Sequence, residues 1–318
     1  MKENRCLYCY LPLSDEEKDF HPRCSKMFFG TPTPPALDYD NEQMKQLAKE
    51  IVIKSIAVTG VQPKLSLNLE KKPDSRGKNR LTIVGMWGDF ILKPPTQSFP
   101  SLPENEDLTM HLSQLMKIPT ATHSLIRLKS GELAYLTKRF DRDNGNKLAL
   151  EDMCQLTETL TEDKYRSSME KVGKIINAYS GQPGIDIIQF FDLTLFCFLT
   201  GNADMHLKNF SLLTDKEQLT RLAPVYDLLS THLAMPADKE EMALTLNARK
   251  NKIKKGDFDS LARNLGINEK AMNNSYKRFS TRLTQLNEFV NISFLPSDLK
   301  DAYKAMMIRN AQKIGLLA

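Results

Sequence analysis

The sequence predicts an α+β protein with two lobes, a small β-rich N-lobe over residues 51–137 and a larger helical C-lobe over residues 138–318. The length of 318 residues suits two domains of ~100–200 residues each. Short segments in which apolar and polar residues alternate are concentrated before residue 137, and longer segments with helical periodicity follow. A run of strands followed by a run of helices is typical of the α+β class, and the crevice between such lobes is the expected ligand site.

The composition is that of a globular protein, with 41% hydrophobic and 26% charged residues. No run of ~18 apolar residues is present, and the N-terminus lacks the apolar core of a signal peptide. We therefore expect a cytoplasmic protein that has no membrane partner. In that compartment the five cysteines are expected to be thiols or metal ligands rather than disulfides.

The first thirty residues contain two closely spaced ligand pairs, Cys6-x2-Cys9 and His21-x2-Cys24. Three thiols and one imidazole in this spacing suit a structural, tetrahedral Zn²⁺ site, which we expect to form a zinc knuckle over residues 1–30. The alternative is that the cysteines are small buried residues and the histidine lies on the surface. The Pro-rich stretch that follows predicts a linker, and residues 31–50 lead into the N-lobe.

The N-lobe is expected to consist of short strands with one helix. In the first strand Leu65, Leu67 and Leu69 alternate with polar residues, which is the period of a half-buried strand. Further strands are expected over 81–84, 90–93, 124–128 and 132–137. Residues 104–116 carry leucines at helical spacing and predict an intervening helix with one apolar face.

The C-lobe is expected to be mainly helical. Helices are predicted over 151–160, 164–179 and 184–202, and three more helical segments end at Leu317. The segment 185–200 is apolar nearly all round, which indicates a helix buried in the core.

The stretch GNADMHLKNFSLL, residues 201–213, places four polar groups directly after that helix. Asp204, His206, Lys208 and Asn209 thus lie on a loop between the buried helix and a short predicted strand or hairpin, a common place for catalytic groups. Asp204, Asn209 five residues later and Asp227 eighteen residues further on have the spacing found in phosphoryl-transfer enzymes. There the first aspartate accepts the proton of the attacking hydroxyl, while the other two side chains hold Mg²⁺.

A nucleotide would also need a cation and a covering loop in the N-lobe. Lys93, near the end of a strand, is placed to reach phosphates, and Glu106 at the start of the helix could pair with it. Residues 59–62 can form a turn over the nucleotide. Taken singly these signals are weak: Asp-x-His is more often a capped turn, and Asp227 could simply cap the helix that follows. Their joint occurrence in this order favours a kinase.

The same motifs resemble those of the HipA-like serine/threonine protein kinases, the toxins of bacterial toxin–antitoxin modules that are linked to persistence. The resemblance covers roughly residues 50–318 and is carried by residues 55–67, 90–106, 138–143, 151–158, 201–213, 223–230 and 245–258. It implies a bilobed, protein-kinase-like HipA fold. The chain is most similar to the short HipT-type kinases of three-gene modules, because the extra N-terminal domain of long HipA proteins is expected to be absent, with a separate small protein supplying it.

The resemblance also implies a role for each matching position. Asp204 would be the catalytic base, and Asn209 and Asp227 would hold Mg²⁺. The residues implied in binding ATP are Thr59, Gly60, Val61, Gln62, Pro63, Lys64, Lys93, Glu106, Lys138, Arg139, Phe140, His206, Leu207, Lys208, Asn209, Tyr226 and Asp227.

Regulation, substrate and partner follow from the resemblance as well. Members of the family phosphorylate serines in their own nucleotide loop; here that place falls on Ala57, so Thr59 and Ser55 are the candidate autophosphorylation sites. The implied protein substrate is an aminoacyl-tRNA synthetase. The implied partner is an antitoxin of the HipB or HipS type, and DNA would be contacted only through that antitoxin.

Two other functions remain open from the sequence. A small-molecule kinase is one, because antibiotic phosphotransferases use a similar arrangement of Asp, Asn and Asp. The other is a catalytically idle regulator that binds DNA or a partner protein through the cysteine segment and the basic run 249–255. Such a regulator would show no metal-dependent ATP turnover, and its DNA binding would weaken steeply with salt.

Overall fold

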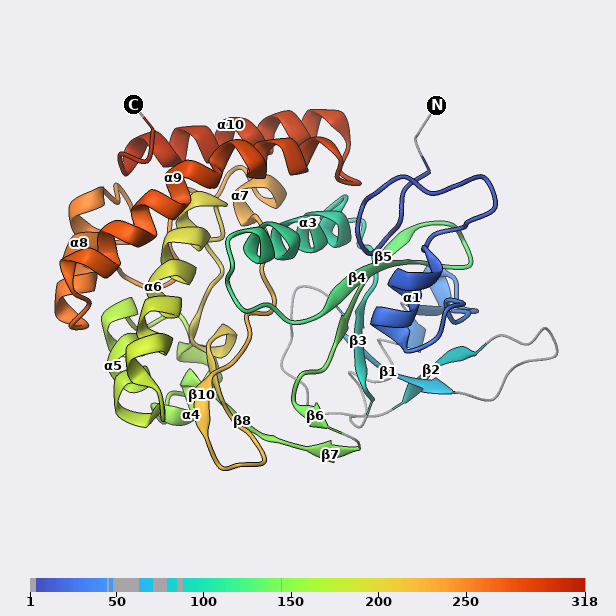
Figure 1. Cartoon of the computed structure of the whole chain (residues 1–318), viewed down its shortest axis with the longest axis horizontal. Helices are drawn as coiled ribbons and strands as arrows, with labels where there is room; N and C mark the ends of the chain where they lie inside the picture. Colours follow the sequence, from blue (N-terminus) through green and yellow to red (C-terminus); the bar gives the residue numbers. More distant parts are fainter. Residues whose placement is uncertain are drawn as a thin grey trace. The chain divides into compact units, whose positions relative to one another are not determined.

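The computed structural model describes residues 4–44, 46–47, 63–70, 79–84, 88–143 and 145–317. The chain divides into two compact units. Unit 1 comprises Met1–Asp107, Ala121–Phe140 and Ile292–Phe294, and unit 2 comprises Leu108–Thr120, Asp141–Asn291 and Leu295–Ala318. Unit 1 is built on a sheet and unit 2 is mainly helical (Figure 1). No helix in the described ranges combines the length and apolar character that crossing a membrane requires.

Unit 1 contains a five-stranded antiparallel sheet in the order β2-β1-β3-β5-β4. Its strands are β1 (Leu65–Glu70), β2 (Arg80–Val84), β3 (Phe90–Lys93), β4 (His123–Arg127) and β5 (Leu133–Lys138). All five strands were predicted; β3 has the predicted bounds, and the bounds of β2, β4 and β5 differ from the predicted ones by one residue. Leu65 and Leu67 of β1 are buried and alternate with partly exposed residues, as expected for a strand that is buried on one face, whereas β4 is buried at four successive residues.

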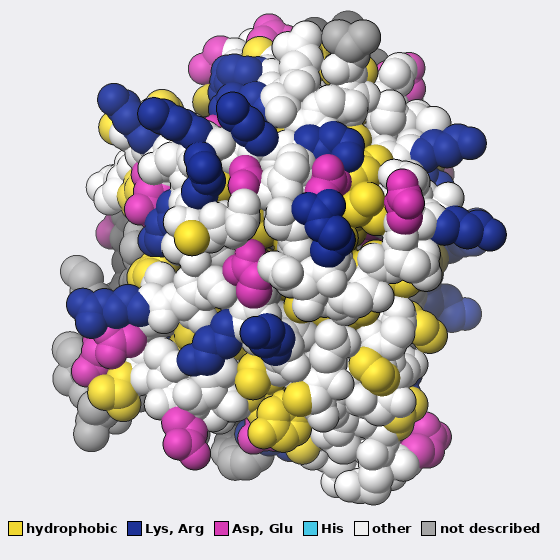
Figure 2. Space-filling view, turned by 90° about the vertical axis from the view of Figure 1, so that its left-hand side faces the viewer, with side chains coloured by type: hydrophobic (Ala, Val, Ile, Leu, Met, Phe, Trp, Pro, Cys, Tyr) yellow, Lys and Arg dark blue, Asp and Glu magenta, His cyan; other side chains and the backbone are white. Residues whose placement is uncertain are grey.

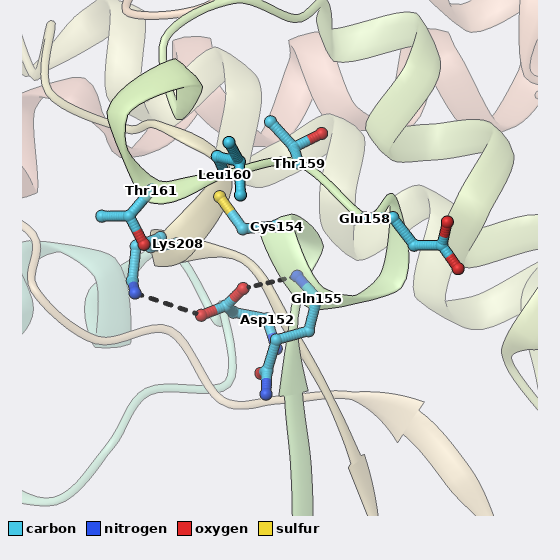
Figure 3. Close-up of a pocket in the computed structure, with 8 residues that line it drawn as sticks. All are labelled: Asp152, Cys154, Gln155, Glu158, Thr159, Leu160, Thr161 and Lys208. Atoms are coloured by element: carbon cyan, nitrogen blue, oxygen red, sulfur yellow. Dashed lines mark hydrogen bonds and ion pairs between the residues drawn. The ribbon is translucent and has the colours of Figure 1, made fainter.

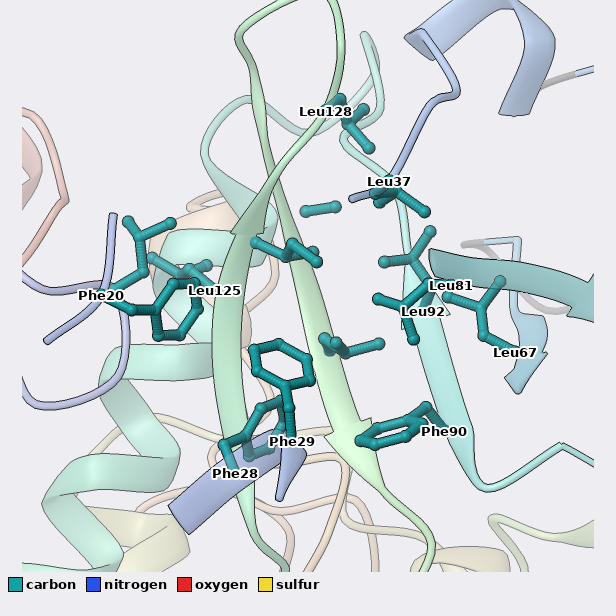
Figure 4. Packing of buried hydrophobic residues seen from close by; sticks show 14 of the residues in the cluster. Phe20, Phe28, Phe29, Leu37, Leu67, Leu81, Phe90, Leu92, Leu125 and Leu128 are labelled. Carbon is teal, nitrogen blue, oxygen red and sulfur yellow. The ribbon is translucent and has the colours of Figure 1, made fainter. Parts of the chain in front are cut away.

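The core of unit 1 lies between this sheet and α1 (Pro22–Phe29) (Figure 4). Phe28 and Phe29 of the helix pack their rings against Phe90 of β3, with centroids 5.8 and 6.2 Å away. In the sheet, Leu67 lies opposite Phe90 and Leu65 opposite Leu92, so these apolar side chains form one continuous layer. The N-terminal segment, residues 4–44, therefore supplies one side of the core.

The N-terminal segment also bonds to both edges of the sheet. At β4, the carbonyl of Leu7 accepts hydrogen bonds from the N–H of Leu125 (3.2 Å) and the hydroxyl of Ser124 (3.1 Å). At β2, the carbonyl of Ala36 accepts from the N–H of Leu81 at 3.0 Å. Edge strands expose unpaired backbone groups, and these bonds satisfy some of them.

The helix α3 (Leu102–Leu115) confirms the predicted helix but is buried far more completely than one leucine face implies. Its buried polar side chains are Asn105, Glu106, Asp107, Thr109, His111 and Ser113. In unit 1, Asp107 accepts hydrogen bonds from the Tyr10 hydroxyl at 2.6 Å and from Nδ1 of His123 at 2.8 Å. Partners that are distant in sequence make this polar burial possible.

Unit 2 is organised around α6 (Pro183–Leu199), whose C-terminal half is fully buried as predicted, whereas Ile185 in its first turn is 55% exposed. It packs against α5 (Met169–Tyr179), α8 (Lys255–Asn264), α9 (Glu269–Asn291) and α10 (Ser297–Lys313). Shorter elements complete the unit: β6 (Arg142–Asp143), β7 (Asn146–Lys147), β8 (Ala149–Asp152), α4 (Met153–Leu156), β9 (Ser211–Thr214), β10 (Thr220–Leu222) and α7 (Thr231–Ala234). Strands β8, β9 and β10 form a small antiparallel sheet.

Two predicted helices were too long. Over 151–160, residues Glu151 and Asp152 end β8, and α4 begins only at Met153, because Asp152 caps it through reciprocal hydrogen bonds with Gln155. Over 164–179 the helix α5 begins only at Met169, where Ser168 accepts a hydrogen bond from the N–H of Lys171. In both cases a polar cap sets the first helical residue, and apolar periodicity alone does not locate it.

Candidate active site

The loop that carries Asp204 begins where α6 ends. Gly201 adopts φ +62°, a left-handed conformation that terminates the helix and favours glycine. A Cβ at this position would lie 2.5 Å from the sulfur of Met306. The N–H of Asn202 then donates to the carbonyl of Cys197 at 2.8 Å, so the chain turns sharply out of the buried helix.

Side chains hold this turn in place. The Thr231 hydroxyl accepts from the N–H of Ala203 (2.8 Å) and donates to the carbonyl of Gly201 (3.1 Å). Oδ1 of Asn202 accepts from the N–H of Asp204 at 3.1 Å. Within residues 201–210 the side chains are buried except Asp204 and Lys208, which are partly exposed. The loop thus presents one fixed carboxylate to solvent.

Asn209 is oriented by the backbone of the same loop. It lies in the 3-10 turn η2 (Leu207–Asn209), and its Nδ2 donates to the main-chain carbonyl of Asp204 at 3.0 Å. Because a carbonyl can only accept, this bond fixes which end of the amide is nitrogen. The oxygen Oδ1 is therefore the atom of Asn209 that can ligate a cation.

The segment containing Asp227 is attached to this loop through its neighbour Tyr226. The Tyr226 hydroxyl donates to the carbonyl of Lys208 at 2.9 Å and is 2.6 Å from the hydroxyl of Ser211. Asp227 itself has φ +60°, a conformation that costs energy for residues other than glycine and often marks functional positions. It does not cap α7, whose N-cap residue is Ser230. Asn209 and Asp227 supply the amide and carboxylate oxygens that suit Mg²⁺.

Tyr165 contacts the exposed carboxylate directly. Its hydroxyl donates to Oδ1 of Asp204 at 2.5 Å, and its ring meets the ring of His206 edge-on at 5.0 Å. Burial, followed by this hydrogen bond, raises the pKa of Tyr165, so the phenol stays protonated at neutral pH. No pattern in the sequence indicated this contact, because its residues lie 39 positions apart.

Two buried polar atoms of the loop have no hydrogen-bond partner among the described residues: Nδ1 of His206 and Nδ2 of Asn202. Burial lowers the pKa of His206, although the nearby charge of Asp204 acts in the opposite sense. The imidazole is therefore neutral near pH 7. Buried polar groups nearly always have partners, so these two atoms indicate that water or a ligand completes the site.

In unit 1, Lys93 and Glu106 form a buried ion pair. Nζ of Lys93 lies 2.5 Å from Oε1 of Glu106, and the side chains are 4% and 0% exposed. The ammonium also lies 5.4 Å from the ring centroid of Tyr135, which faces Lys93 on the neighbouring strand β5. The pairing that the sequence suggested is present, and it orients the lysine.

The remaining predicted residues are distributed as follows. Ser55 and residues 59–62 lie outside the described residues, while Pro63 and Lys64 directly precede β1. The N–H groups of Lys138 and Arg139 donate to the carbonyls of Thr122 and Asp89, both at 2.8 Å, so the protein itself uses these two donors. Leu207 is fully buried and anchors η2.

A pocket of about 440 Å³ opens beside Lys208 in unit 2 (Figure 3). It is lined by Asp152, Cys154, Gln155, Glu158, Thr159, Leu160, Thr161 and Lys208. Asp152 lies between Nζ of Lys208 at 3.9 Å and the N–H of Gln155 at 3.0 Å. Since Asp204, Asn209 and Asp227 do not line it, this pocket adjoins the candidate site without containing it.

Three of the five basic residues in the run 249–255 pair with acidic neighbours in unit 2. Its ion pairs are Arg249–Asp257 (3.9 Å), Lys250–Glu240 (3.2 Å) and Lys255–Asp259 (3.0 Å). On the face shown in Figure 2, acidic side chains lie between the basic ones. A surface that binds DNA needs unneutralised cations, so these pairs argue against the run as a DNA-binding surface.

Comparison with known proteins identifies the family of the chain. Residues 56–286 match the family of HipA-like C-terminal domains, and the chain belongs to this family. Among its relatives are "Putative kinase Y4dM" of Sinorhizobium fredii, 30% identical over 76% of this chain and 60% of that protein, and the serine/threonine-protein kinase toxin HipA of Shewanella oneidensis, 24% identical over 81% and 64%.

Among solved structures, the chain resembles HipA of Shewanella oneidensis, determined in a complex of the toxin–antitoxin system with HipB and operator DNA. The TM-score is 0.66 at 21% identity, covering 84% of this chain and 70% of HipA. The predicted α+β fold of HipA type is thereby confirmed. The chain spans about half to two thirds of the length of the curated relatives it matches.

Proposed function

We propose that the protein is an ATP- and Mg²⁺-dependent serine/threonine protein kinase. The observation that carries the proposal is the loop 201–210, in which Asp204 is fixed and partly exposed while Asn209 and the Tyr226–Asp227 segment are bonded to the same loop. Phosphoryl transfer needs mainly positioning and charge neutralisation, and this arrangement supplies a fixed carboxylate beside two cation ligands.

In the reaction, the hydroxyl oxygen of the substrate attacks the γ-phosphorus of ATP, and the bond from that phosphorus to the β,γ-bridging oxygen breaks. Asp204 orients the hydroxyl and accepts its proton, so the products are a phosphate ester and ADP. Asn209 Oδ1 and the Asp227 carboxylate would hold Mg²⁺, and the ion would supply neutralisation of phosphate charge. Lys93 of unit 1, oriented by Glu106, is the proposed phosphate-binding cation.

The substrate and partner are proposed from the relatives. A kinase toxin with an antitoxin such as HipB is the context of the Shewanella HipA. We place this chain in a module of the same kind, with an antitoxin of HipB or HipS type and an aminoacyl-tRNA synthetase as the protein substrate. The loop residues Thr59 and Ser55 are proposed sites of autophosphorylation.

Transfer of labelled phosphate from ATP tests the kinase proposal. We expect Asp204→Asn to reduce transfer by about 100-fold or more, because a positioned general base typically contributes a factor of this size. Asp301→Asn is a matched control: its side chain is 76% exposed on α10, and we expect wild-type transfer. A wild-type protein that binds ATP and labels no protein would contradict the proposal, and label on sugars or aminoglycosides alone would identify a small-molecule kinase.

A cytosolic extract and purified aminoacyl-tRNA synthetases serve as acceptors in that assay. Mass spectrometry of peptides 50–66 locates self-labelling separately. Phosphate on a synthetase supports the proposed substrate, whereas phosphate restricted to Thr59 or Ser55 supports autophosphorylation alone.

A further inference from the structure

The four predicted metal ligands of the N-terminal segment meet in unit 1. One ligand atom from each of Cys6, Cys9, His21 and Cys24 can be chosen so that all four lie within 4.8 Å of one another. Nδ1 of His21 lies 3.4 Å from the sulfur of Cys9 and 3.7 Å from that of Cys24. In a tetrahedral Zn²⁺ site with ordinary bond lengths, sulfur and nitrogen ligands are about 3.6 Å apart. The two distances agree with that geometry.

The histidine is already in the form that binds a metal. Its Nε2 is 3.0 Å from the carbonyl of Pro12, so Nε2 carries the proton and donates it. The lone pair of Nδ1 therefore faces the cysteines. A metal-binding histidine typically donates its other N–H to a carbonyl or carboxylate, which fixes the ring. His21 shows that arrangement.

Hydrogen bonds between His21 and the cysteines explain the arrangement of these four side chains less well than one shared metal ion does. Nδ1 offers one lone pair in the plane of the ring, yet two sulfurs lie at similar distances from it. One cation at the centre would instead bind all four ligands at once. Three thiolates and an imidazole are soft and borderline ligands that select Zn²⁺ over Mg²⁺ or Ca²⁺.

The local backbone brings the ligands together from two short elements. The N–H of Tyr10 donates to the carbonyl of Cys6 at 2.9 Å, which closes a turn that contains both Cys6 and Cys9. His21 and Cys24 lie at the start of α1, where Pro22 is the first helical residue. His21 is the N-cap residue but makes no capping bond, so its ring is available to the cluster.

We propose that Cys6, Cys9, His21 and Cys24 bind one structural Zn²⁺ ion, and that this ion holds the N-terminal segment on the sheet of unit 1. Four protein ligands leave no open position, which is the mark of a structural rather than a catalytic site. The ion would join the turn that contains Leu7 to the start of α1. Leu7 bonds to edge strand β4, and Phe28 and Phe29 of α1 pack on β3. The site is independent of the proposed kinase activity.

Elemental analysis of the reduced, full-length chain tests the proposal. We expect about one zinc per chain in wild type, and less than about a tenth of that in the Cys9→Ser/Cys24→Ser double variant. Cys154→Ser removes a thiol that lies outside the cluster, and we expect it to retain the zinc of wild type.

Cobalt substitution keeps the test decisive if the double variant does not fold. Wild type stripped of metal and reconstituted with Co²⁺ should show the visible absorption of tetrahedral thiolate coordination. Reduced wild type that contains no zinc and takes up neither Zn²⁺ nor Co²⁺ would overturn the proposal. So would a disulfide between two of these cysteines in the protein isolated from cells, or zinc that persists undiminished in the double variant.

Discussion

At the scale of single residues, the contact between Tyr165 and Asp204 has a direct functional meaning. The proposed reaction requires Asp204 to accept a hydrogen bond from the substrate hydroxyl. Tyr165 donates such a bond to Oδ1 of Asp204, so it occupies one of the acceptor sites on this carboxylate for which a substrate hydroxyl would compete. Tyr165 is 39% exposed, and this accessibility lets the ring move aside at moderate cost.

We therefore expect Tyr165→Phe to raise kcat/KM for phosphate transfer about two- to five-fold, because the variant has no hydroxyl to displace. A hydrogen bond to a charged group is worth about 1.5–3 kcal/mol when buried, and solvent exposure reduces that figure. The pKa of Tyr165 is raised, so the hydroxyl is protonated throughout the neutral range. The ratio of variant to wild-type rates should then stay constant from about pH 6 to 9.

Steady-state kinetics across that pH range provide the measurement. Tyr179→Phe is a matched control, because Tyr179 is an exposed tyrosine at the C-terminal end of α5. A drop in kcat for Tyr165→Phe would show that the hydroxyl supports catalysis instead of competing with substrate.

At the scale of elements, the end of α6 determines where the catalytic loop begins. Gly201 has a left-handed φ, and a Cβ at this position would lie too close to the sulfur of Met306. Alanine is therefore disfavoured both by the backbone conformation and by the lack of space. Gly184, in the first turn of the same helix, has open space around it and no positive φ.

These two glycines make a matched pair of substitutions. We expect Gly201→Ala to lower the free energy of unfolding by about 1–3 kcal/mol and to reduce phosphate transfer, because the loop would shift. Gly184→Ala should be neutral or stabilise the protein by up to about 1 kcal/mol, since alanine favours helix. Urea unfolding measures both. Equal effects of the two substitutions would mean that the left-handed turn is not required.

Much of this element structure was predictable from the sequence. The strand β1 and the hairpin β9–β10 follow from local alternation, and α6 follows from its continuous apolar run. The polar loop could be located because it interrupts that run.

Contacts between distant parts of the chain were harder to predict. The burial of Asp107 depends on Tyr10 and His123, and the bond to Asp204 depends on Tyr165. Periodicity describes one element at a time, so it contains no signal for such pairs. The Lys93–Glu106 pair was expected only because a strand lysine, followed by a glutamate at the start of a helix, matches the order of functional groups in kinases.

At the scale of the whole molecule, the two units should respond differently to loss of zinc. The proposed ion lies in unit 1, and the segment it holds covers one face of that sheet and bonds to its β4 edge. Metal removal should therefore loosen unit 1 and leave the helical core around α6 unchanged.

Hydrogen exchange with and without a chelator measures this difference. We expect faster exchange in residues 4–29 and in β4 after zinc is removed, with no change in α6, because local opening reflects local contacts. The Cys9→Ser/Cys24→Ser variant is the control and should not respond to the chelator. Faster exchange throughout both units would indicate that the chain unfolds as one cooperative body.

The position of the cysteine cluster also bears on how the chain is made. Cys24 leaves the ribosome about 66 residues before Phe90 of β3, which at ordinary rates of synthesis is a delay of roughly 3–13 seconds. Throughout that time Phe28 and Phe29 have no sheet to pack against. All four metal ligands have been synthesised by then, so a bound ion can fold the segment around itself first. The nascent chain would thus keep its earliest apolar residues from aggregating until the strands that bury them arrive.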